Sequence, residues 1–291
     1  MKETANEGLA REVRRYESGA QTGWGPRVWM GMFRGLWRSR ELVWRLFMRD
    51  FTARYRQTVL GVGWALIMPL VAVGTFAFLN KSGVVTMGPI GIPYLAYAIV
   101  GLTAWQVFAG GLTACCDAII NGYNMVVTAN FPKETLVIAS LGQTLVEFLV
   151  RLALTAVVFA YYGILPPAAA LLFPFAILPL AFLTLGVGLM LSLLNALLRD
   201  VANVVTLLTT FLLFVTPVLY PAPASGALAV FTRYNPLAAL IAGARDLVVS
   251  GRIEQPAQFA WASVLSAVVF LASWRVFKLA EPRMAERVGA R

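Results

Sequence analysis

Two side chains of opposite charge, Glu147 and Arg151, interrupt a long apolar stretch of the sequence. A single charge at the centre of a bilayer costs roughly 2.5–3.5 kcal/mol on insertion scales, so such a residue needs a partner. Four positions apart on a helix, the two side chains share a face and can form an ion pair. One carboxylate and one guanidinium are a poor acid–base set. Two interpretations stay open: a pair that locks one helix to another, and a polar lining of a substrate path.

Other chemistry-bearing residues are scarce. The chain has no His and two Cys, the adjacent Cys115 and Cys116. Zinc, haem and His-based acid–base chemistry therefore have almost no ligands, and we predict neither a metal site nor a catalytic residue. The phosphate-binding pattern G-x-x-x-x-G-K-[ST] does not occur, so we expect no cofactor on this chain and no nucleotide hydrolysis by it. If ATP drives its function, ATP and Mg bind a separate chain.

The composition places these residues in a membrane. The 291 residues are 59% hydrophobic and 13% charged, whereas a soluble domain carries about 25% charge. The net charge of +10 does not indicate nucleic-acid binding, because residues 1–56 hold 12 of the 24 Lys and Arg residues and residues 274–291 hold 5 more. Those ends flank the apolar body, as the positive-inside rule expects. We predict an all-α polytopic membrane protein with no nucleic-acid partner.

Six apolar runs are long enough, at 1.5 Å per residue, to cross a hydrocarbon core of about 30 Å. They lie at Gly61–Leu79, Tyr94–Ala114, Leu136–Tyr162, Ala168–Leu194, Val201–Tyr220 and Ala257–Trp274. With both termini cytoplasmic, the inner segments hold 19 Lys and Arg residues and the outer segments hold 4. This asymmetry predicts six spans with that orientation.

The remaining segments are assigned from their composition. Residues 1–35 are a polar cytoplasmic segment, 59–274 form the transmembrane domain, and 275–291 are a basic cytoplasmic tail. Residues 36–58 place aromatic side chains mostly on one side of a helix and Arg on the other, which is typical of a helix at the membrane surface. A helix packed on a soluble partner is the alternative. Residues 221–256 are apolar but broken, and predict short outer re-entrant helices.

Aromatic residues are frequent, and most are expected at membrane interfaces or against lipid. A minority could line a channel in which sugar rings slide over aromatic faces, since each such contact is weak enough to release. The candidate channel residues, with the charged pair added, are Trp64, Phe76, Tyr94, Tyr97, Trp105, Phe108, Phe211, Phe214, Glu147 and Arg151.

Several stretches together resemble one family. RDFTARYRQTVLGVGWALIMPL at residues 49–70 is similar to the N-terminal signature of the permease subunits of type-2 ABC polysaccharide exporters, which export O-antigen, teichoic acid or capsule. The other matching stretches are Asn130–Lys133, Leu198–Val201, Thr216–Tyr220, Asn235–Leu237 and Arg245-Asp246. Thr216 stands where the family pattern leads us to expect Ser, and both residues carry a hydroxyl.

The resemblance implies a homodimer in the bacterial inner membrane, two ATP-binding cassette subunits below it, and a lipid-linked polysaccharide, O-antigen first among them, as cargo. It implies that the inner loop at about 117–135 docks on the ATPase, with Asn130, Phe131, Pro132, Lys133 and Glu134 as coupling residues. It also suggests that arginines of the surface helix meet a lipid pyrophosphate, although anionic membrane lipid is an equal alternative. These are Arg38, Arg40, Arg45, Arg49, Arg54 and Arg56.

Two other functions stay possible at this stage. One is an ABC exporter of a smaller glycolipid or a drug. The other is a membrane-embedded enzyme that modifies glycans. Such an enzyme needs acidic or His residues gathered at one membrane face, and the outer segments offer only Asp246 and Glu254.

Overall fold

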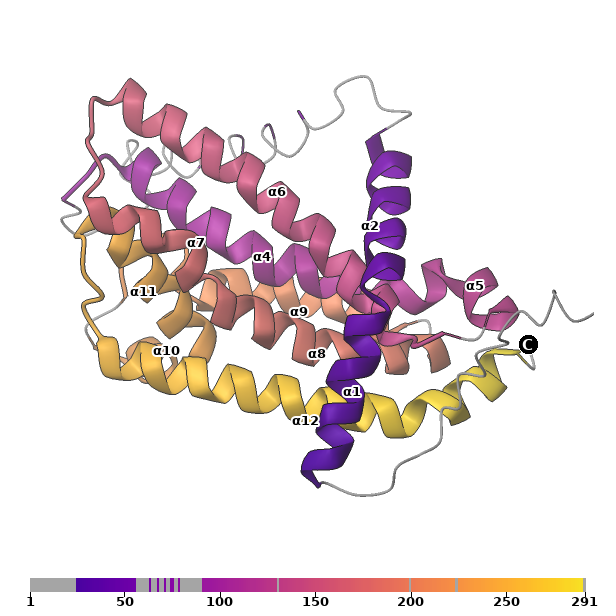
Figure 1. Cartoon of the computed structure of the whole chain (residues 1–291). Coiled ribbons are helices and arrows are strands. Elements are labelled where there is room, and N and C mark those ends of the chain that lie inside the picture. Colours follow the sequence, from indigo (N-terminus) through magenta and orange to yellow (C-terminus); the bar gives the residue numbers. More distant parts are fainter. Residues whose placement is uncertain are drawn as a thin grey trace, which may run out of the picture.

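The computed structural model describes residues 25–55, 91–129, 131–198, 200–222 and 225–289, together with six single positions between 63 and 78 (Figure 1). The secondary structure of this part is helical throughout, which confirms the predicted all-α class. The helices are α1 (Pro26–Arg38), α2 (Arg40–Tyr55), α4 (Tyr94–Asn121), α5 (Tyr123–Thr128), α6 (Glu134–Tyr161), η3 (Ala168–Leu172), α7 (Phe173–Ala176), α8 (Leu178–Leu197), α9 (Val201–Val215), α10 (Ala227–Tyr234), α11 (Pro236–Val249) and α12 (Pro256–Gly289).

Four helical segments in the described part are long and apolar enough to cross a membrane: α4, α6, the continuous segment from η3 to α8, and α12 up to Pro282. The bent pair α10 and α11, with 80° between them, makes a fifth if it is counted as one broken span. α9 is apolar but has only 15 residues, because it ends before Thr216-Pro217. The predicted span 61–79 lies mostly outside the described residues, so the number of six stays a prediction.

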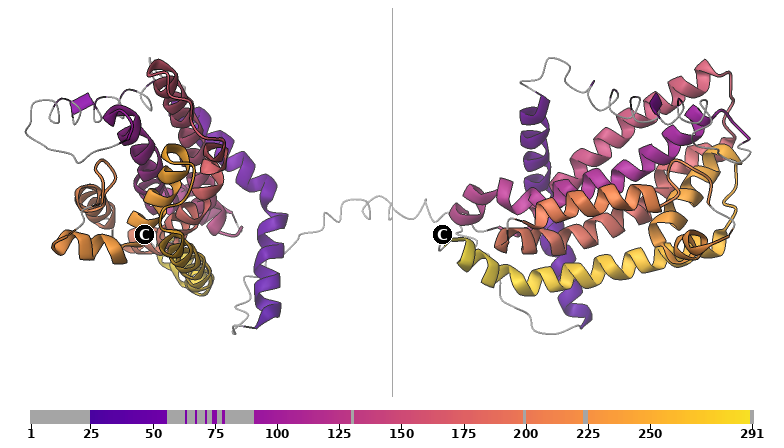
Figure 2. Two further views of the ribbon diagram at one scale, coloured as in Figure 1. Left: turned by 90° about the vertical axis from the view of Figure 1, so that its left-hand side faces the viewer. Right: turned by 180° about the vertical axis from the view of Figure 1, so that it is seen from behind.

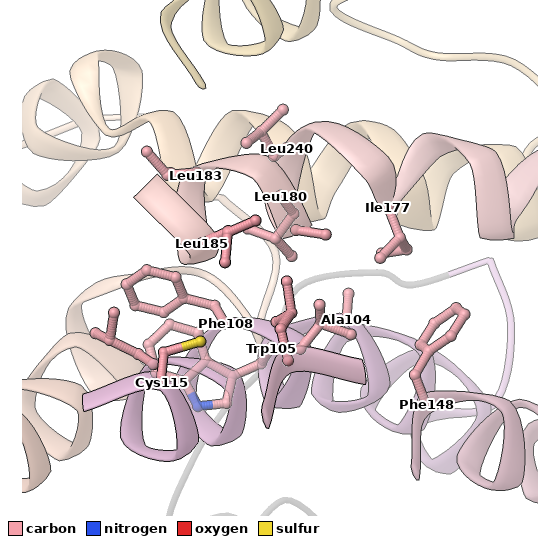
Figure 3. Close-up of a cluster of buried hydrophobic side chains, with 14 of the residues drawn as sticks. Ala104, Trp105, Phe108, Cys115, Phe148, Ile177, Leu180, Leu183, Leu185 and Leu240 are labelled. Carbon is pink, nitrogen blue, oxygen red and sulfur yellow. The ribbon is translucent and has the colours of Figure 1, made fainter. Parts of the chain in front are cut away.

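The helix α8 lies at the centre of the bundle, packed against α4 and α12 (Figure 2). Two glycines make this possible. A Cβ at Gly186 would lie 2.8 Å from the Cα of Phe270 on α12, and one at Gly188 would lie 2.5 Å from the Cβ of Cys115 on α4. Small residues let helix backbones approach closely where no hydrophobic driving force from water exists. Trp105 and Phe108 of α4 lie in the resulting core with Leu180 of α8 (Figure 3).

The bundle has two different ends. At one end lie α5 and the C-terminal part of α12, and we call this the α5 end (Figure 1). At the opposite end lie α7, α10 and α11, and we call this the α11 end. Asn235 begins α11 by accepting a hydrogen bond from the backbone N–H of Leu237, with Pro236 at the first helical position. This is a favourable helix start, which explains the sharp bend between α10 and α11.

The N-terminal helices α1 and α2 cross the long helices of the bundle (Figures 1 and 2). The structure differs from the single helix predicted for residues 36–58. The helical segment begins at Pro26 and is broken at Ser39 into α1 and α2. The hydroxyl and the backbone N–H of Ser39 both donate to the carbonyl oxygen of Gly35. α1 packs the ring of Phe33 edge-on against Trp274 of α12 at 4.9 Å. The aromatic residues of this segment thus serve partly to attach it to the bundle.

Candidate functional site

A groove of about 730 Å³ opens at the α5 end between α2, α4, α6 and α9. Its wall combines apolar surface with polar side chains that are mostly uncharged, and most of its lining comes from one face of α4. The residues that line this groove, which we call the α5-end groove, include Gln106, Gly110, Thr113, Asp117 and Asn121 of α4, Ser140 and Gln143 of α6, Thr209 of α9, and Arg49, Asp50 and Ala53 of α2. Amides and hydroxyls both donate and accept hydrogen bonds, so this wall can exchange partners with a hydroxyl-rich molecule.

The carboxylate of Asp117, which lines the groove, is held by a residue that does not line it. Asn195 of α8 donates from Nδ2 to Oδ1 of Asp117 at 3.0 Å and to the carbonyl oxygen of Cys116 at 3.1 Å. Asn195 is 1% exposed. This amide therefore fixes the last turns of α4 against α8, so that the groove wall has a rigid backing.

Among the predicted basic residues, Arg49 alone belongs to the described lining of the groove. Its Nε donates to Asp50 Oδ1 at 2.7 Å, and its Nη1 lies 2.8 Å from the sulfur of Met125 on α5. Arg45 pairs with Glu41 at 2.7 Å on the exposed side of α2, and Arg40 lies over the ring of Trp37. Arg38 ends α1. The Arg54 side chain and Arg56 lie outside the described residues, and a role with pyrophosphate stays a prediction for the whole set.

The coupling residues expected from the family motif point inward. Phe131, Pro132, Lys133 and Glu134 are buried, whereas Asn130 lies outside the described residues. Lys133 Nζ donates to the carbonyl oxygen of Ala129 at 2.8 Å and lies 4.2 Å above the ring of Phe131. Burial lowers the pKa of Lys133, and the nearby Glu281 carboxylate opposes this shift. In this conformation the motif thus supports the end of α5; its coupling role stays a prediction.

Part of the exposed surface at this end belongs to α5. Tyr123 is 39% and Val127 48% exposed, and Asn124 and Thr128 are also exposed. α5 follows α4 after the single residue Gly122, and Thr128 bonds back to the carbonyl of Asn124. A short helix with an accessible apolar side chain at the end of the bundle is a surface on which a second protein can dock.

The aromatic channel candidates fall into separate groups. Tyr97, Trp105 and Phe108 are buried, the latter two between α4 and α8, while Tyr94 is half-buried. In contrast, Phe211 and Phe214 project from α9 with 61% and 59% of their surface exposed. Trp64 and Phe76 lie outside the described residues. Only the two α9 rings among the described candidates are accessible to cargo in this conformation, and a channel role stays a prediction for all of them.

The charged pair of the third predicted span is formed. Arg151 Nη2 lies 2.9 Å from Glu147 Oε2, and both side chains are largely buried. The backbone carbonyl of Arg151 accepts from the hydroxyl of Thr155, which lies 3.4 Å from that of Thr103 on α4. The ion pair lies within α6, whereas the contact to α4 is made by Thr155, and neither side chain of the pair lines the α5-end groove, so both interpretations of the pair stay predictions.

A second cavity, of about 990 Å³, lies at the α11 end between α10, α11 and the start of α12. Arg245 of α11 lines it and is 4% exposed. Its Nη1 donates to the carbonyl oxygens of Pro217 and Val218 at 3.2 and 3.1 Å, and its guanidinium lies 4.1 Å above the ring of Tyr97. The Arg–Asp motif found in the sequence thus fastens the end of α9 to α11 and α4.

Several residues of these sites were missed from the sequence. The groove amides Gln106 and Gln143 lie 37 positions apart on different helices. Lys278 and Glu281, which contact the loop before α6, were assigned to a basic tail. Polar residues inside apolar spans were the available signal for the two glutamines, because such residues are rare in membranes and mark contact with protein or cavity.

Comparison with known proteins agrees with this geometry. The ABC-2 type transporter family matches residues 41–249. The chain is similar to the O-antigen export system permease protein RfbA of Myxococcus xanthus, with 26% identity over 264 residues, covering 88% of this chain and 99% of that protein. It is also similar to an O-antigen export system permease protein RfbA of Klebsiella pneumoniae, with 26% identity over 208 residues, covering 71% of this chain and 79% of that protein. With most of its length matched, this chain belongs to the ABC-2 type transporter membrane family.

Proposed function

We propose that this protein is the transmembrane subunit of an ATP-driven exporter that moves a lipid-linked polysaccharide, O-antigen in the first instance, across the bacterial inner membrane. The observation that carries this proposal is the match to an O-antigen export permease along 99% of that relative's length. ATP and Mg would bind two separate ATPase subunits, and the permease would act as a homodimer with both termini in the cytoplasm. The smaller-cargo exporter and the glycan-modifying enzyme have no observation in the described residues that favours them.

The α5-end groove suits the head of such a cargo. Its amides and hydroxyls can bond to sugar hydroxyls in many registers, so a polymer need not bind tightly at any one place. Arg49 lies at the edge contributed by α2, where its planar donors could meet a phosphate of the lipid carrier. The exposed rings of Phe211 and Phe214 lie on a different side of α9 from Thr209, where they could contact a second protomer or the lipid tail.

The cargo-binding part of this proposal can be tested in the groove. Replacing Gln106 and Gln143 together by Leu should lower glycan export while leaving ATP hydrolysis by the assembled transporter nearly unchanged. Each lost hydrogen bond is worth about 0.5–1.5 kcal/mol, so the two together should reduce the export rate roughly 5- to 150-fold. Surface glycan is measured by gel and immunoblot. The control is Thr210→Val on the exposed side of α9, and an unchanged export rate in the double variant would exclude the groove as the path.

The ATPase docking surface can be tested on α5. Val127→Asp places a charge on the exposed face of α5 and should remove the ATPase from a detergent pull-down of the tagged permease, because desolvating an unpaired charge at an interface is costly. Leu198→Asp adds the same charge to an exposed residue at the same end, outside α5, and should retain the ATPase. Mass spectrometry identifies the partner by its phosphate-binding loop. Recovery of wild-type permease without any ATPase would overturn the proposed function itself.

A further inference from the structure

One turn of α12 binds the loop between α5 and α6 through charged groups. Lys278 Nζ lies 2.7 Å from Oε1 of Glu134, the first residue of α6, and 3.1 Å from Oε2 of Glu281. The other oxygen of Glu281 accepts the backbone N–H of Lys133 at 2.9 Å. Lys278 and Glu281 are three residues apart and face the loop together. We call these four residues, Lys133, Glu134, Lys278 and Glu281, the α12 clamp.

The clamp is buried. Glu134 is 1% and Glu281 4% exposed, and the side chain of Lys278 is 14% exposed. Charges removed from water are tolerated only when they are paired and hydrogen-bonded, and removing one partner leaves the other uncompensated. Glu281 and Lys133 are 148 positions apart along the chain, so the arrangement is set by tertiary packing and not by the local helix. A surface ion pair between mobile chains would lack both features.

The clamp reaches α5 through Lys133. The backbone N–H of Lys133 donates to Glu281, while its ammonium donates to the carbonyl oxygen of Ala129, the C-cap residue directly after α5. At its other end α5 is joined to α4 through Gly122, and Met125 of α5 also contacts Arg49 of α2. The clamp is thus the charged link from α5 to α12, beside direct contacts between the two helices, and α12 in turn packs along α8.

From this geometry we infer that the C-terminal part of α12 is a coupling element, in which Lys278 and Glu281 are positioning residues that make α12 follow any movement of α5. The inference rests on the proposed function, in which an ATPase docks on α5. A push on α5 reaches α4 directly through Gly122 and reaches α12 only through the clamp and the neighbouring contacts of α5 with α12. Without the clamp, the ATPase would still dock and hydrolyse ATP, but only the direct contacts of α5 with α12 would tie movement of α12 to hydrolysis.

The test uses the full permease purified with its ATPase partner, with ATP hydrolysis measured per complex and surface glycan measured in the same strain. Glu281→Gln is nearly isosteric and Lys278→Met removes the central charge. Both should keep the ATPase in the pull-down and keep hydrolysis within about twofold, while glycan exported per ATP falls at least about tenfold, because a broken buried pair is strongly unfavourable. Leu279→Gln, an exposed change on the same turn, is the control and should leave both rates unchanged.

A charge reversal provides the decisive readout. Glu134→Lys alone should uncouple export from hydrolysis, and adding Lys278→Glu should restore part of the lost export, since that pair is re-formed with opposite signs while the new carboxylate lies beside Glu281. A structural role alone would lower the amount of complex and both activities in parallel, without recovery in the double variant, and that result would overturn the inference. Wild-type export per ATP in Lys278→Met and Glu281→Gln would also overturn it. Failure of wild-type permease to bind an ATPase would instead contradict the proposed function.

Discussion

Replacing Gly188 with Val is expected to prevent the protein from accumulating in the membrane. Even the Cβ of an Ala at this position would lie 2.5 Å from the Cβ of Cys115, whereas carbon atoms in contact prefer about 3.5–4.0 Å. α4 and α8 would have to separate along the centre of the bundle. Overpacking of this kind costs typically about 1–3 kcal/mol and occasionally more, which raises the unfolded fraction roughly 5- to 150-fold and lowers abundance because unfolded chains are degraded. Immunoblots of the membrane fraction measure the effect for Val, and thermal unfolding in detergent measures it for Ala.

A second substitution tests the cause. Cys115→Gly combined with Gly188→Ala moves the Cβ from one helix to the other and should restore much of the thermal stability lost in Gly188→Ala. Gly110→Ala is the matched control, because a Cβ there would meet Gln106 at an ordinary 3.6 Å. If Gly188→Ala were as stable as the control, the close packing of α4 on α8 would be contradicted.

The long helices follow from the sequence, and the divisions of the fourth predicted span follow from proline. Tyr94 begins both the predicted second span and α4, and Tyr162 ends the predicted third span one residue after α6. The fourth predicted span is one continuous apolar run, but the structure divides it into η3, α7 and α8 because Pro174 and Pro179 each lack the N–H that a helix interior needs. Hydropathy detects the apolar run, and the divisions within it depend on the two prolines.

The sites are harder to predict, because burial in a membrane protein does not separate apolar from polar faces. Trp105 and Phe108 look like channel residues by type, yet they face α8, and nothing in the apolar pattern of α4 distinguishes that side. The Glu147–Arg151 pair was predictable because its two members lie on one helix. The contact of Lys278 with Glu134 was not, since it joins segments far apart in the chain and depends on how α12 crosses the α5 end.

Arg245→Met should disrupt the α11 end and abolish most glycan export while leaving the ATPase bound, because the change lies at the opposite end from α5. Arg245 is the hydrogen-bond donor to two adjacent buried carbonyls, those of Pro217 and Val218, and it stacks on Tyr97. Each carbonyl left without a partner costs about 1–3 kcal/mol, and Met supplies no donor. Arg245→Lys keeps the charge but presents a compact ammonium in place of the planar guanidinium, so an intermediate loss of export is expected.

A second arginine of the same cavity provides a control that separates the effect of the Arg245 hydrogen bonds from the effect of positive charge. Arg233 also lines it, from the exposed last turn of α10, and Arg233→Met removes an equal charge without breaking a buried contact of Arg245. A single cysteine at Ala238, which lines the cavity and is 3% exposed, reports the opening of this end by its rate of thiol labelling, because Cys115 and Cys116 are buried. The rate should rise at least about tenfold in Arg245→Met, as loss of more than 1.4 kcal/mol implies, and stay unchanged in Arg233→Met. An equal rise of the labelling rate in both variants would mean that charge in the cavity, and not the bonds of Arg245 to the end of α9, keeps this end closed.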